Sequence, residues 1–141
     1  INGKMNEAEA AMGILQLRYF DKNILRRKKI YKKYEEYFES IGGIRLMDIP
    51  KNVEYNYGYC PIFFSDGKKT RDKVYNALLN ENIACRKYWY PLVTNHSIYN
   101  QYKKLDINNA QKLSDSVLCL PIYPDLKYEV LEKIFKIISF L

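Results

Sequence analysis

The spacing of apolar residues changes along the chain and is most strongly helical near the start. Residues 7–19 place small or apolar side chains on nearly every side of a predicted helix. Asn6, with Glu9 three residues later, has the spacing of a capping box and predicts that this helix begins near Glu7. A helix that is apolar on all sides is normally buried, so we expect other parts of a protein to cover it.

The helical pattern continues from residue 21 to about residue 40, now with one apolar stripe and one polar face. Two glycines, Gly42 and Gly43, are expected to end it. Further helices are predicted at 68–80, 96–103, 108–116 and 127–140. Within the helix at 68–80, we expect Val74, Leu78 and Leu79 to face inward.

Alternation of side chains predicts the strands. A short strand is expected at 44–47, and residues 54–64 alternate, with tyrosines on one face. Pro61 lacks a backbone N–H, which places the end of that strand at a sheet edge or bulge. Residues 83–90 predict a second strand, and 117–122 a short extended run. Together these elements predict one compact α/β unit.

Composition narrows the class of protein. Hydrophobic residues make up 48% of the 141 residues and charged residues 28%, a balance typical of a folded globular domain. No apolar run approaches the roughly 20 residues that a membrane-spanning helix needs. The chain has three cysteines, far apart in sequence, and one histidine, so we expect no metal site and no disulfide framework. These features favour a cytoplasmic protein without a membrane partner.

The net charge of +7 raises the possibility of nucleic-acid binding, because phosphate backbones attract basic surfaces. The densest basic run lies at 26–33, opposite the apolar stripe of a predicted helix. Such residues commonly form the solvated face of a helix, and the chain has no zinc-finger or RNP-type motif. We therefore expect no nucleic-acid partner, and a basic nucleic-acid-binding module is the weakest of the functional hypotheses.

One segment, ACRKYWYPL at 84–92, concentrates the candidate chemistry. In an extended strand Arg86, Tyr88 and Tyr90 share one face and could bind a phosphate or a sugar. An ordinary aromatic-rich sheet face explains the same pattern equally well. The single histidine, His96, is expected to cap a helix or lie on the surface rather than act as a general base.

The opening residues NGKMNEAEAAMGILQL, at 2–17, resemble the signature of the DegT/DnrJ/StrS sugar-nucleotide aminotransferases. The positions in register are Asn2, Lys4, Met5, Glu7, Ala10, Ala11, Gly13, Gln16 and Leu17. Glu9 stands where the family commonly has glutamine. The segments YNYGYCPI, RDKVYNALLNENI, RKYWYPL and VLCLPIYPDL then follow in the family's order. The resemblance covers essentially the whole chain.

This resemblance implies a fold and a place within a longer protein. Residues 1–141 would be the C-terminal, small domain of an aspartate-aminotransferase-like fold, including the helix that connects it to the large domain. Long N-terminal helices would lead into a small, mostly antiparallel sheet flanked by helices. The large domain, which makes most of the contacts to the cofactor pyridoxal 5′-phosphate (PLP), would lie upstream of Ile1. The lysine that forms the Schiff base lies there in the family, so this chain is expected to hold no catalytic residue and to be inactive alone.

The resemblance also assigns roles to individual residues. It implies that Asn2 reaches the cofactor phosphate of the other subunit of a homodimer, and that Lys4 meets the phosphates or sugar of the substrate. It implies that Arg86, Tyr88 and Tyr90 border the sugar pocket. Many family members continue Tyr-Pro-Leu with histidine, where this chain has Val93, so no role is transferred from that histidine.

By this resemblance the intact protein would transfer an amino group from glutamate to a keto sugar nucleotide. The Arg-(Arg/Lys)-Tyr-(Phe/Trp)-Tyr-Pro-Leu pattern is similar to that of members acting on dTDP-linked 4-keto-6-deoxy sugars. The product would supply surface polysaccharide. A second hypothesis is a non-enzymatic relative that binds PLP for regulation without turnover.

Overall fold

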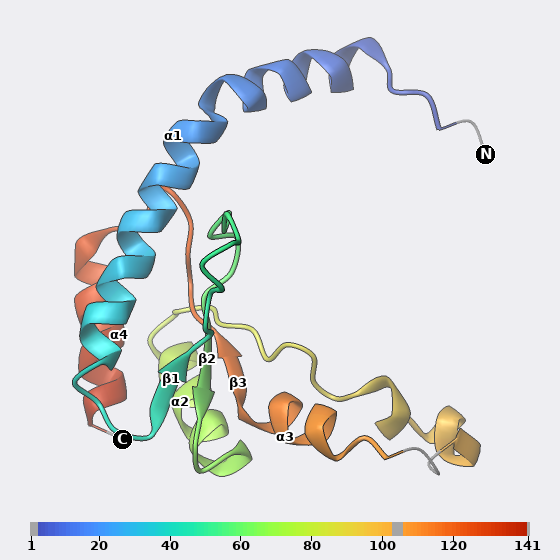
Figure 1. Cartoon of the computed structure of the whole chain (residues 1–141), viewed down its shortest axis with the longest axis vertical. Helices are drawn as coiled ribbons and strands as arrows, with labels where there is room; N and C mark the ends of the chain where they lie inside the picture. Colours follow the sequence, from blue (N-terminus) through green and yellow to red (C-terminus); the bar gives the residue numbers. More distant parts are fainter. Residues whose placement is uncertain (1–2, 103–105, 141) are drawn as a thin grey trace.

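A three-stranded antiparallel sheet and the helices around it form the body of the molecule, shown by a computed structural model that describes residues 3–102 and 106–140 (Figure 1). The helices are α1 (Glu7–Phe38), α2 (Lys68–Asn80), α3 (Asn108–Ser116) and α4 (Tyr128–Ser139), with 3-10 turns η1 (Val93–Asn95) and η2 (Ser97–Tyr102). The strands are β1 (Ile44–Leu46), β2 (Pro61–Phe64) and β3 (Val117–Cys119). The sheet order is β1-β2-β3.

Helix α1 begins at the capping box predicted from the sequence. The Asn6 side chain accepts a hydrogen bond from the Glu9 amide at 2.8 Å, and the Glu9 carboxylate accepts one from the Asn6 amide at 3.0 Å. Both bonds satisfy N–H groups that a helix start would otherwise leave unpaired. The helix then runs without interruption to Phe38, close to the predicted end.

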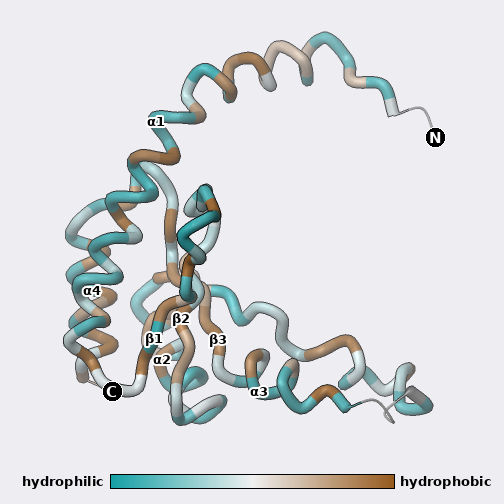
Figure 2. Tube along the Cα trace, in the orientation of Figure 1, coloured by the Kyte–Doolittle hydropathy of each residue, from teal (hydrophilic) through white to brown (hydrophobic). Residues whose placement is uncertain are grey.

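Only the second half of α1 packs against the rest of the body. Its buried residues all lie at or after Ile30, while the first half projects away from the sheet (Figure 1). Met12, Leu17 and Phe20 are 58%, 71% and 50% exposed. In Figure 2, brown, hydrophobic positions lie along this projecting half of α1. None of the described elements of this chain buries that half, so its cover by other parts of a protein stays a prediction.

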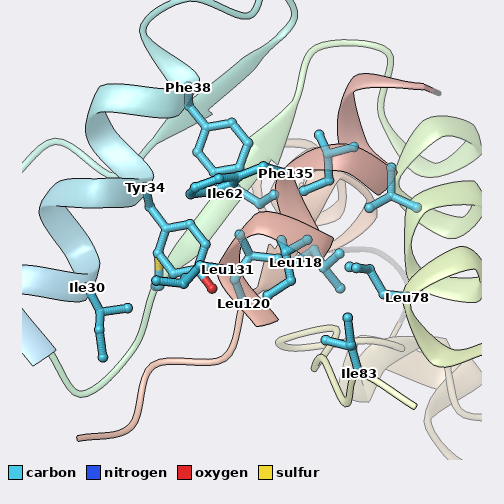
Figure 3. Close-up of a cluster of buried hydrophobic side chains, with 14 of the residues drawn as sticks. Ile30, Tyr34, Phe38, Ile62, Leu78, Ile83, Leu118, Leu120, Leu131 and Phe135 are labelled. Carbon is cyan, nitrogen blue, oxygen red and sulfur yellow. The ribbon is translucent and has the colours of Figure 1, made fainter. Parts of the chain in front are cut away.

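The core lies on one face of the sheet, between the sheet and helices α1, α2 and α4. The pleat directs Ile62, Phe64 and Leu118 to this face, where they meet Tyr34 and Phe38 of α1. Helix α4 contributes Leu131, Ile134, Phe135 and Ile138, and α2 contributes Val74 and Leu78. Figure 3 shows part of this core, in which labelled side chains such as Tyr34, Ile62 and Leu78 converge from elements far apart in sequence.

The opposite face of the sheet carries the alternate residues, among them Phe63 and Cys119, and faces toward α3. Pro61 also lies on this face, at the first position of β2. Of the two positions predicted for Pro61, a sheet edge or a bulge, the edge is wrong, because β2 is the middle strand. A proline is tolerated there because the first residue of a strand need not donate to the ladder.

All four predicted strands are shorter than their patterns, and two of them, at 54–64 and 83–90, lose most of their length. The alternation at 54–64 forms a strand only at Pro61–Phe64, because Tyr57 adopts a left-handed φ of 52° and the Tyr55 hydroxyl donates to the Tyr59 carbonyl at 2.8 Å. The predicted strand at 83–90 is reduced to one bridge, between Arg86 and Cys119. The chain then turns, and the Tyr90 amide donates to the Lys87 carbonyl at 3.2 Å.

The helices at 68–80, 108–116 and 127–140 are confirmed to within one residue at each end. Leu79 is an exception to the predicted packing, since it is 51% exposed while Leu78 is fully buried. In the part of the chain that is described, no helix combines the length and apolar content needed to cross a bilayer.

Candidate functional site

A large hollow lies on the face of the sheet opposite the core. This apolar pocket, of about 570 Å³, falls within the range of roughly 300–1,000 Å³ typical of small-molecule sites. Five aromatic side chains line it beside aliphatic ones: Tyr55, Tyr59, Phe63, Tyr88 and Trp89. Rings at this density offer stacking surfaces for a planar or sugar ring.

A second hollow adjoins the first and carries the charge that the apolar pocket lacks. This Arg86 pocket, of about 470 Å³, shares Tyr59, Tyr88 and Cys119 with the apolar pocket. Arg86 Nη1 donates to the Tyr88 hydroxyl at 2.6 Å, and this bond raises the pKa of the guanidinium. The Tyr88 ring packs edge-on against Tyr59, with centroids 5.5 Å apart. A fixed cation beside an aromatic pocket suits a ligand with a ring at one end and an anion at the other.

The structure brings Arg86 and Tyr88 together as the sequence predicts, but it separates Tyr90 from them. The turn at residues 87–90 places Tyr90 beside α2, with its ring centroid 4.5 Å from the Arg71 guanidinium. The prediction that all three share one face is wrong, because that face exists only while the strand stays extended and the strand stops after Arg86.

The other side of the segment holds an ion cluster that sequence reasoning missed. Lys87 Nζ and Arg71 Nε lie 2.7 and 2.8 Å from Asp72 Oδ1. Lys68 Nζ lies 3.3 Å from Asp72 Oδ2. Partial burial works to raise the pKa of Asp72, but hydrogen bonding to Lys87 and the charge of Arg71 outweigh it, so the pKa lies below the usual value. The only available signal was the i,i+4 spacing of Lys68 and Asp72.

Arg71 is fully buried and links three elements. Its Nη1 donates to the Ser114 carbonyl in α3 at 2.9 Å, and the Ser114 hydroxyl donates to the Trp89 carbonyl at 2.5 Å. Nothing in the local pattern of α2 marks Arg71 as buried, because arginines at such positions usually face solvent.

The remaining predicted residues lie elsewhere. Lys4 is exposed, on the segment before α1, and that segment lies at the far end of the helix from the sheet (Figure 1). Asn2 lies outside the described residues. His96 is exposed and follows η1, which agrees with the predicted surface position.

A thiol nucleophile, a metal ion and PLP each set requirements against which the two pockets can be compared. Cys119 lines both hollows, but burial raises its pKa to about 11, so its thiol stays protonated at neutral pH. Among the described residues, no group of three or more histidines, cysteines or acids is placed to hold a metal ion. PLP requires a lysine for its aldehyde and a partner for its pyridine nitrogen. Neither hollow is lined by a lysine or a carboxylate, so neither fits the cofactor by itself.

Comparison with known proteins is consistent across sequence and structure. The model of the DegT/DnrJ/EryC1/StrS aminotransferase family matches residues 1–139. The Escherichia coli dTDP-4-amino-4,6-dideoxy-D-glucose transaminase is 39% identical over 142 residues, which cover 98% of this chain and 38% of the relative.

Two solved structures share the fold. Helicobacter pylori PseC, an aminotransferase involved in the biosynthesis of pseudoaminic acid, matches with a TM-score of 0.86 at 16% identity, over 99% of this chain and 38% of its own. The aminotransferase TlmJ from Streptoalloteichus hindustanus matches with a TM-score of 0.84 at 20% identity, over 96% and 36%. These matches confirm the predicted α/β fold class, that of the aspartate-aminotransferase-like proteins. The chain thus spans somewhat more than a third of the length of the proteins it matches.

Proposed function

The chain belongs to the DegT/DnrJ/EryC1/StrS aminotransferase family, and from that premise we propose that it is the C-terminal, small-domain part of a PLP-dependent sugar-nucleotide transaminase. The intact enzyme transfers an amino group from glutamate to a keto sugar nucleotide, a dTDP-4-keto-6-deoxy sugar, for surface polysaccharide. The observation that carries this proposal is the 39% identity, over 98% of this chain, to a transaminase whose name specifies a dTDP-4-amino-4,6-dideoxy sugar.

We propose that the intact protein is a cytoplasmic homodimer in which the catalytic lysine and most cofactor contacts lie outside this chain. PLP, when bound, supplies the electron sink for amino transfer. The apolar and Arg86 pockets lack the groups that hold PLP, which supports a division of labour between two domains. On this proposal, residues 1–141 alone catalyse no transamination.

The proposed task of this chain is to bind and orient the substrate. The Arg86 guanidinium supplies a fixed positive charge for a phosphate, and the aromatic wall beside it supplies a stacking surface. Tyr88 joins the two, because it lines both pockets and its hydroxyl accepts from Arg86. Substrate binding by Lys4 and Tyr90, and cofactor binding by Asn2, stay predictions.

The test is the visible absorption spectrum of the intact gene product, purified with PLP, before and after glutamate is added. We expect the PLP absorbance to convert to that of the pyridoxamine form, and a dTDP-4-keto-6-deoxy sugar to convert it back. A stable PLP spectrum that ignores amino donors would contradict the transaminase and support the regulatory relative. Conversion by glutamate without reversal by the sugar nucleotide would contradict only the proposed acceptor.

A further inference from the structure

We propose that Asp72, together with Arg71, is a positioning residue for the substrate-binding segment at 86–90. The pair holds Lys87 against α2, so that Arg86 and Tyr88 face the two pockets on the other side. The effect of this tether on substrate binding rests on the proposed function. The tether itself rests on contacts within this chain.

The first anchor is the Asp72 carboxylate. Lys87 Nζ lies 2.7 Å from Oδ1, and the Lys87 side chain is only 21% exposed although it carries a full charge. The same ammonium lies 4.0 Å from the centroid of the Tyr75 ring, a second attraction from α2. The Lys87 ammonium group is therefore bound by Asp72 and Tyr75 of α2 and is largely shielded from solvent.

The second anchor is reached through Arg71. Its guanidinium pairs with Asp72 at 2.8 Å and donates to the Ser114 carbonyl at 2.9 Å. The Ser114 hydroxyl in turn donates to the carbonyl of Trp89. The turn is therefore held at Lys87 by an ion pair and at Trp89 by a hydrogen bond, and both anchors lead back to the same pair on α2.

The backbone before the turn explains why this tether orients Arg86. Two hydrogen bonds with Cys119, of 3.2 and 2.8 Å, fix the Arg86 main chain in an extended bridge. Successive side chains of an extended chain point to opposite sides, so drawing Lys87 toward α2 directs Arg86 the other way. The bridge fixes the main chain at Arg86 alone, so the direction that the chain takes at Lys87 depends on the tether.

The test uses Trp89, the one tryptophan among the 141 residues, as a reporter within the segment. In the 141-residue chain, Asp72→Asn should lower the steady-state fluorescence anisotropy of Trp89, because the segment gains local motion. Asp66→Asn removes one carboxylate from the exposed turn before α2 and should leave the anisotropy unchanged. A folded Asp72→Asn variant, verified by far-ultraviolet circular dichroism, with wild-type anisotropy would overturn the proposal.

A second variant covers the case in which Asp72→Asn does not fold. Lys87→Met removes only the segment's own tether and leaves the Arg71–Asp72 pair intact, and it should lower the anisotropy in the same way. Lys87→Arg keeps the cation and should restore the wild-type value, while Lys69→Met, at an exposed position of α2, serves as the matched control. Equal anisotropy in Lys87→Met and wild type would contradict the tether.

The intact enzyme supplies the functional readout. Lys87→Met should raise KM for the sugar nucleotide by about tenfold, with kcat and the KM for glutamate unchanged, because binding is weakened without loss of chemistry. Lys87→Met added to Asp72→Asn should raise the KM for the sugar nucleotide little beyond the value of Asp72→Asn alone, because that variant has already lost the ion pair between Lys87 and Asp72. An equal rise in the KM for glutamate would overturn the positioning role. An enzyme that accepts no sugar nucleotide would overturn the proposed function alone, and the Trp89 anisotropy would still decide the tether.

Discussion

The Arg71–Asp72 pair predicts an asymmetry between two substitutions that each remove one charge. Arg71 is fully buried, whereas the Asp72 side chain is 27% exposed. Removing the carboxylate leaves a buried guanidinium and two neighbouring ammonium groups without their anion. Removing the guanidinium leaves a partly solvated carboxylate that keeps two lysines. We therefore expect Asp72→Asn to destabilise the fold more than Arg71→Met.

The magnitudes follow from what each variant leaves unpaired. Breaking a buried ion pair so that one charge remains typically costs about 3–5 kcal/mol, and the value for Asp72→Asn should lie near the lower end because this carboxylate is partly solvated. Arg71→Met leaves the Ser114 carbonyl without a donor, which costs about 1–3 kcal/mol, but it places an apolar side chain of similar length in a buried site. Arg71 Nη2 has no hydrogen-bond partner among the described residues, so its loss costs little. The expected difference between the variants is about 1–2 kcal/mol.

The assay is equilibrium urea unfolding of both variants and wild type, followed by circular dichroism at 222 nm, with free energies extrapolated to water at shared m-values. If Arg71→Met lowers the free energy of unfolding as much as Asp72→Asn does, or more, the reasoning from burial is refuted. Asp115→Asn, in α3, controls for the loss of a carboxylate outside the cluster.

Three further predictions concern the core, pH and the projecting helix. Tyr34→Phe should cost about 1–2 kcal/mol in urea unfolding, because the buried hydroxyl donates to the Pro121 carbonyl at 3.0 Å and its loss leaves that carbonyl unpaired. The pKa of Asp72 is lowered in the folded state, so its ion pairs stabilise the fold fully at pH values above the pKa of this carboxyl in the unfolded chain. This stabilisation should be lost as the pH falls through the lowered pKa of the folded state. Urea unfolding measured against pH should therefore show a smaller acid-induced loss of stability in Asp72→Asn than in wild type. Light scattering of the 141-residue chain should show concentration-dependent self-association through the exposed apolar residues of α1, and Leu17→Glu should reduce it, whereas a mass that stays monomeric at all concentrations would contradict this.

The elements that local chemistry specifies were predictable from the sequence. The capping box at Asn6 works through hydrogen bonds within one turn, and the apolar stripes of α2 and α4 repeat every three to four residues. The contact of Arg86 with Tyr88 agrees with the prediction, although the extended strand on which that prediction rested stops after Arg86. The family resemblance, confirmed over residues 1–139, rests on motifs of the same local kind.

Contacts between distant segments were decided by the tertiary structure alone. The strand predicted at 83–90 ends after Arg86, and the next residue, Lys87, meets Asp72, a partner fifteen positions earlier whose place no periodicity reveals. The turn that follows places Tyr90 away from Arg86 and over the buried Arg71. The burial of Arg71 likewise depends on α3 and the turn closing over it. Sequence patterns record the period of an element and its apolar face, whereas the partner of a charged side chain is set by how separate elements pack, and this packing shapes the candidate site.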